Sequence, residues 1–179
     1  MTRTLMALAL ALILLMGVSA PAFAGQASTA PAAVPAASRA QTHAAFLDKT
    51  RFLGHAGIAF FAIHHEYKRF TEGYFASGAA HRTRNIVVAA AVLLIAYHEA
   101  KVAYGIAEKS NSKTLHALVS PFNALITTIA TIRGRVTKGD VSSADMESLN
   151  GAATTINHQS AQTDVGTIHD VAAPLPSGA

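Results

Sequence analysis

The chain has 179 residues, of which 51% are hydrophobic and 13% are charged, and its formal net charge is +4. The high hydrophobic content excludes an intrinsically disordered protein, because such chains combine low hydrophobicity with high net charge. The absence of cysteine excludes disulfide frameworks, thiolate metal sites, iron–sulfur clusters, covalently attached haem and cysteine nucleophiles.

The N-terminal segment has the three parts of a secretory signal peptide. Arg3 supplies a short positive region, residues 5–18 form an apolar run, and residues 22–24 (Ala-Phe-Ala) form a small-residue cleavage site. The apolar run is shorter than the roughly 20 residues that span a bilayer, which favours cleavage over a retained anchor. We therefore expect residues 1–24 to be removed and the protein to be secreted or periplasmic.

The rest of the chain divides into three parts by composition. Residues 25–42 are rich in Ala, Pro, Ser and Gln and show no periodicity, which predicts a flexible linker. Residues 43–162 carry helical patterns, and their length fits one domain. Residues 163–179 end in VAAPLPSGA, which predicts a loose C-terminal tail.

The first predicted helix runs from about 43 to 70. Its centre, 52–63, is apolar nearly all the way round, which indicates burial on several sides. Gly54 and Gly57 interrupt this centre, and each costs about 1 kcal/mol of helix stability relative to alanine. We expect these glycines to allow the close approach of another backbone or of a ligand. The Gly and Ser content of 71–82 predicts a loop.

The second predicted helix, from about 84 to 108, contains the most apolar run of the domain. Residues 86–96 are rich in β-branched side chains and would also suit a buried strand, but the length of the pattern favours a helix. The strongly apolar stretches 52–65 and 85–98 are both short of a bilayer span. We therefore expect no membrane span after signal cleavage, with a membrane hairpin as the alternative.

Local signals mark the starts of the last two predicted helices. Ser120 followed by Pro121 predicts an N-cap and a first helical residue, so 113–133 forms either one kinked helix or a short helix before the main one. Ser142 and Asp145 resemble a capping box at the start of the fourth helix. Four amphipathic helices with short connections predict an all-α fold resembling a four-helix bundle.

The chain contains nine histidines although it has few charged residues, and histidine is a side chain that can bind a metal ion or a haem iron. His98 lies four residues from both Leu94 and Val102, so we expect its face of the helix to point to the core or a pocket. If the first two helices are antiparallel, His98 lies level with His64 and His65. These two are about 100° apart around the helix, so only one of them points inward.

Two imidazoles from facing helices are what a six-coordinate haem iron needs, and without cysteine the haem would be of b type. His98 with His64 or His65 is the candidate axial pair, and His55 lies about 15 Å further along the helix, where it serves a second site or none. Bases near the turn between these helices are the candidate propionate contacts: Lys68, Arg69 and Lys101.

A transition-metal ion on His64, His65 and His98 is a weaker alternative, because neither H-E-x-x-H nor Glu-x-x-His spacing is present. For any single histidine, a hydrogen-bonded core or boundary position is the simpler interpretation. No nucleophile elbow, phosphate loop or pair of carboxylates on one face is recognisable, so an enzyme is not favoured.

The charge distribution points to a binding role. Residues 49–113 contain nine bases against four acids, which suits an anionic partner. The sequence thus predicts first a non-enzymatic interaction protein of the cell envelope, whose partner is an unknown protein or an anionic envelope component. The alternatives are a haem-binding electron-transfer or carrier protein and a histidine-based metal-binding protein. Nucleic acid is not an expected partner after export.

Overall fold

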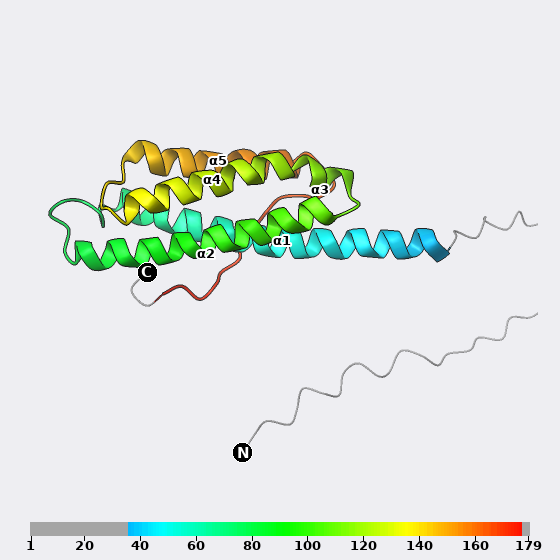
Figure 1. The fold of residues 1–179 in the computed structure, drawn as a ribbon, viewed down its shortest axis with the longest axis horizontal. Helices are drawn as coiled ribbons and strands as arrows, with labels where there is room; N and C mark the ends of the chain where they lie inside the picture. The colour runs from blue at the N-terminus through cyan, green and yellow to red at the C-terminus, as the bar shows by residue number, and fades with distance from the viewer. Residues whose placement is uncertain (1–35, 177–179) are drawn as a thin grey trace, which may run out of the picture. The chain divides into compact units, whose positions relative to one another are not determined.

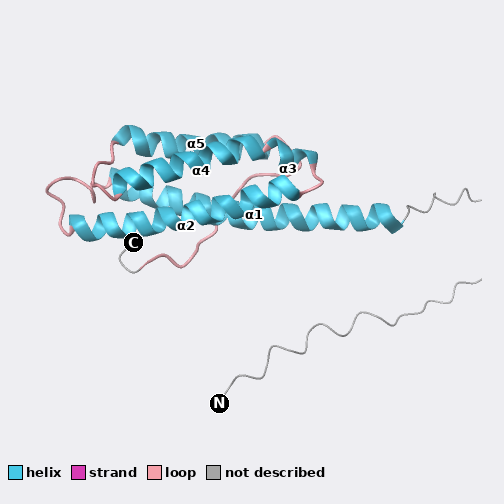
Figure 2. Ribbon diagram, in the orientation of Figure 1, coloured by secondary structure: helices cyan, strands magenta, loops and turns pink. Residues whose placement is uncertain are grey.

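The computed structural model describes residues 36–176, with side chains from residue 43 onward. All regular secondary structure in this range is helical (Figure 2). The five helices are α1 (Ala36–Thr71), α2 (Arg82–Lys109), α3 (Lys113–Ala117), α4 (Val119–Val136) and α5 (Ser143–Ala161). The predicted signal peptide and residues 25–35 of the predicted linker lie outside the described residues.

The long helices pack around a common core, which confirms the all-α prediction. Helix α1 packs on α2, α2 on α4, α4 on α5 and α5 on α1, while the short α3 joins α2 to α4 (Figure 1). This arrangement is compatible with a four-helix bundle. Removal of apolar side chains from water is the main force that holds such helices together. The largest fully buried side chains include Phe52, Phe60, Ile63, Leu93, Phe122, Leu125, Ile129, Met146 and Leu149.

Helix α1 begins earlier than the sequence predicted. Residues 36–42, assigned to the flexible linker, are helical and continuous with the rest of α1. They contain three alanines, the residue with the highest helix propensity. The linker prediction is therefore wrong over these residues.

The region of the third predicted helix forms two helices, α3 and α4, which agrees with the alternative of a short helix before the main one. The backbone N–H of Phe122 donates to the carbonyl of Leu118 at 3.0 Å, so α4 begins before Ser120. The N-cap predicted at Ser120 is therefore wrong. Pro121 lies in the first turn, where a backbone N–H has no partner within the helix and a proline is tolerated.

The capping box predicted at the start of α5 is confirmed. The Ser142 hydroxyl accepts a hydrogen bond from the Asp145 N–H at 3.2 Å, and the Asp145 carboxylate accepts one from the Ser142 N–H at 3.0 Å. Arg135 at the end of α4 forms an ion pair with the same carboxylate. The backbone of Ser142 is the main cause that holds the pKa of Asp145 below its usual value, and burial opposes it.

The C-terminal segment differs from the predicted loose tail. Val165 and Ile168 are buried, with 6% and 2% of their surface exposed. The Ser160 hydroxyl donates to the carbonyl of Gly166 at 2.6 Å, and the N–H of Ile168 donates to the Asn157 side chain at 2.8 Å. These contacts hold residues 163–171, hereafter the strap, against the helices. The composition of the Ala- and Pro-rich end of the chain suggested a loose tail, although the segment contains the two apolar side chains that anchor it.

We predict that Asp145→Asn lowers the free energy of unfolding by about 1 kcal/mol at pH 7, the usual size of a capping contribution. The lowered pKa means that the carboxylate stabilises the fold above the unfolded-state pKa of about 3.9. This stabilisation is lost as the pH falls through the lower pKa of the folded state. Urea unfolding at pH 7 and at pH 3 should show a difference from the unsubstituted protein that is smaller at pH 3.

The matched control is Glu147→Gln, because Glu147 is an exposed acid two residues further along the same helix. Its substitution should leave the free energy of unfolding nearly unchanged at both pH values. Equal effects of the two substitutions would show that general helix-dipole charge, rather than the capping box, is responsible.

Candidate functional site

The register of α1 against α2 decides which side chains meet. The two helices are antiparallel neighbours, with Arg69 bonded to Asn85 at 3.3 Å and His55 bonded to Glu99 at 2.6 Å. The residue numbers of each pair sum to 154. Those of His65 and His98 sum to 163, a mismatch of nine residues or about 13 Å along the axis. The expected fold-back is present, but the two imidazoles are not level.

His98 points away from the core, so the prediction that its helical face is interior is wrong. Its side chain is exposed, and its neighbours on the same face, Val87 and Leu94, are 64% and 46% exposed. The inward face of α2 consists mainly of small residues. A helix that is apolar all round gives no sequence signal for which side packs inward.

The other candidate histidines have separate partners. His64 donates from Nδ1 to Asp170 of the strap at 2.8 Å, and His55 donates from Nδ1 to Glu99 at 2.6 Å. His65 has a buried Nε2 without a hydrogen-bond partner. Within residues 43–176, no group of three metal-ligating side chains comes together. The proposed haem and metal ligand sets therefore do not assemble in the described part of the chain.

The bases expected to contact haem propionates are dispersed. Arg69 is buried and donates to the carboxylate of Glu66 at 3.1 Å. Lys68 is exposed, and the ammonium of Lys101 lies 5.5 Å from the ring centre of Tyr97. Burial is the main cause that lowers the pKa of His65, with Arg69 and Lys68 adding to it. These groups do not converge on one point.

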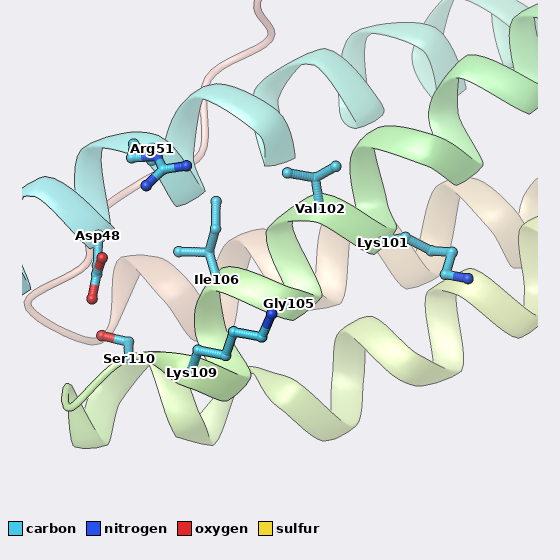
Figure 3. A pocket seen from close by; sticks show the side chains of 8 residues that line it. All are labelled: Asp48, Arg51, Lys101, Val102, Gly105, Ile106, Lys109 and Ser110. Atoms are coloured by element: carbon cyan, nitrogen blue, oxygen red, sulfur yellow. The ribbon is translucent and has the colours of Figure 1, made fainter.

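An open groove lies instead between the N-terminal half of α1 and the C-terminal end of α2 (Figure 3). Its volume is about 420 Å³. Val102 and Ile106 point from α2 toward α1 and form its apolar wall, while Arg51 comes from α1. The lining residues are Asp48, Arg51, Lys101, Val102, Gly105, Ile106, Lys109 and Ser110.

The charges along the groove are predominantly positive. Arg51, Lys101 and Lys109 are opposed by a single acid, Asp48, whose carboxylate points toward Ser110 (Figure 3). A cleft lined mainly by one sign of charge, with apolar walls, concentrates ions of the opposite sign. Arg51 and Lys109 were not singled out from the sequence. The excess of bases over 49–113 was the only signal that pointed to them.

The hydrogen-bonded pair of His55 and Glu99 lies beyond the residues that line the groove. His55 follows Arg51 by four residues on α1, and Glu99 precedes Val102 by three on α2, so both lie one turn further along the same faces.

Comparisons with known proteins give no assignment: no protein family, curated protein or solved structure matches the chain. Among the described residues, α2 alone is long and apolar enough to meet the criteria for a membrane span. That result is weak, because core helices of soluble proteins meet the same criteria. In this structure α2 packs on both α1 and α4.

The geometry predicts that His65 and His98 do not ligate one haem iron. We expect that hemin added to the purified protein does not give a low-spin, six-coordinate absorption spectrum that depends on both histidines. Such a spectrum would be present in the unsubstituted protein and absent from both His65→Ala and His98→Ala. The measurement is a visible absorption titration of the three proteins at equal concentration. If each of the two substitutions, made singly, removed such a spectrum, the two imidazoles would have to reach a common iron, which would contradict the observed register.

Proposed function

We propose that this chain is a small, exported, non-enzymatic binding protein built as a helical bundle. Its ligand site is the groove between α1 and α2, and its ligand carries a phosphate or carboxylate group. The observation that carries this proposal is the charge of the groove, where Arg51 and Lys109 come from opposite helices and Asp48 is the sole acid.

The types of side chain support this ligand class. The guanidinium of Arg51 can donate two parallel hydrogen bonds to a phosphate or carboxylate, and Lys109 adds a second positive charge. Val102 and Ile106 offer an apolar surface to the uncharged part of the ligand.

The proposed location of the protein restricts the class of partner that it can meet. The positive, apolar and cleavage regions of residues 1–24 support export to the periplasm or the exterior. An anionic component of the cell envelope is then the partner that the groove suits best. The open shape of the groove suits one group of a larger polymer more than an enclosed small molecule.

A titration with inorganic pyrophosphate tests the site. We predict that Arg51→Gln and Lys109→Gln each weaken binding about fivefold, because each removes one charge-assisted hydrogen bond worth about 1 kcal/mol at a solvated site. Binding is measured by the change in amide chemical shifts of groove residues such as Val102 and Gly105.

Lys138→Gln is the matched control. Lys138 is an exposed lysine in the turn after α4, next to Gly139, whose carbonyl accepts from Arg82 at the opposite end of α2. This substitution should leave the affinity unchanged. Equal weakening by all three substitutions would indicate general attraction to a basic protein, and no weakening by the two groove substitutions would refute the groove as the site.

A further inference from the structure

The strap is docked on α1 as an extended peptide. The N–H of Val171 donates to the carbonyl of Gly57 at 3.1 Å, and the carboxylate of Asp170 accepts from His64 Nδ1 at 2.8 Å. Ile168 is buried against the core cluster. Over residues 168–171, one buried apolar side chain, one backbone hydrogen bond to α1 and one ion pair with α1 thus hold the peptide on this helix.

Gly57 makes this docking possible. A Cβ atom at position 57 would lie 2.4 Å from the carbonyl oxygen of His169 and 2.6 Å from Cγ2 of Val171. These distances are too short for any side chain, so only glycine allows the strap to lie this close. Gly54, one turn earlier on α1, has no atom within 4 Å of the equivalent position. The close backbone approach expected from the sequence therefore occurs at Gly57 and not at Gly54.

The contacts of residues 169–171 are partly exposed to water, whereas the earlier part of the strap is held by buried Val165 and Ile168, by hydrogen bonds to Ser160 and Asn157, and by the ion pair of Asp164 with Lys49. The side chains of His64 and Asp170 are 37% and 40% exposed, and Val171 is 40% exposed. An ion pair this exposed contributes little to stability. The four long helices also contact one another in a closed ring without the strap. Residues 169–171 are thus a peripheral layer, attached to the fold through Ile168 and the earlier part of the strap.

We infer that this surface of α1, formed by Gly57, His64 and the site filled by Ile168, is a peptide-binding cradle. The strap is its built-in occupant. The partner it fits is an extended segment of another protein that presents an apolar residue, a spacer, an acid and a second apolar residue, as Ile-His-Asp-Val does here. Such a segment replaces the strap by making the same contacts.

The cradle is separate from the groove of the proposed function. Asp48 of the groove and Gly57 of the cradle are nine residues apart, which places them on opposite sides of α1 at 100° per residue. Failure of pyrophosphate binding would leave the cradle unaffected. A tethered strap acts at an effective concentration in the millimolar range, so the unsubstituted protein should bind a free peptide only weakly.

The test uses the full chain with a weakened strap, carrying Ile168→Ser and Asp170→Asn. A fluorescent peptide with the sequence of residues 163–176 is titrated, and binding is followed by fluorescence anisotropy. We expect saturable binding that is at least tenfold tighter than to the unsubstituted chain. Adding Gly57→Ala to the weakened chain should abolish binding, whereas adding Gly54→Ala should not.

Two outcomes would overturn the inference. One is a folded, weakened chain, with its helical circular dichroism retained, that fails to bind the peptide. The other is equal binding with Gly57→Ala and with Gly54→Ala. If the weakened chain does not fold, amide hydrogen exchange of the unsubstituted protein decides. Exchange at Val171 much faster than at Ile63 supports a detachable strap, and equal protection of both amides shows that the strap is a fixed part of the fold.

Discussion

The close approach of α1 and α2 is the constraint on which the rest of the structure depends. The inward face of α2 carries buried alanines at seven-residue spacings: Ala89, Ala96, Ala103, and Ala100, Ala107. Small side chains let the neighbouring backbones come near, and large side chains of α1 such as Phe52 and Ile63 are buried in the same core. Val87 and Leu94 lie on the exposed face of α2.

This choice of face determines what chemistry the helices can bring together. It sets the register in which His55 meets Glu99, and it places Asp48 and Arg51 level with the last two turns of α2. A cationic groove results at that end of the pair. The same choice turns His98 outward, so the outer surface of α2 receives the histidine that a core-facing stripe would have buried.

Local signals predicted well what local physics decides. The existence of the long helices and most of their ends follow from periodicity and breaking residues, although the start of α1 does not. The capping box at Ser142 follows from a four-residue pattern. The sequence did not predict which face of α2 packs inward, because aliphatic side chains surround this helix on every side. The docking of the strap could not be predicted either, because its contacts form only in the folded chain. The N–H of Ile168 donates to the Asn157 side chain, and the N–H of Val171 donates to the carbonyl of Gly57.

For the candidate site too, the sequence showed which residue types are present, but not which of them meet in the folded chain. The excess of bases in 49–113 was visible in the sequence, but only the register shows that Arg51 and Lys109 share a groove. The histidines were visible too, yet spacing along two helices cannot fix their relative height to better than two turns. An error of nine residues in register was enough to separate His65 from His98.

The two interior glycines of α1 show how function can be read from a local energetic conflict. Each lowers helix stability by about 1 kcal/mol relative to alanine. At Gly54 the space around the backbone is empty, and nothing in the structure explains the glycine. At Gly57 a second backbone occupies the position of the missing side chain. The strap is therefore specified by the sequence of α1 as much as by its own, and its docking surface belongs to the helix.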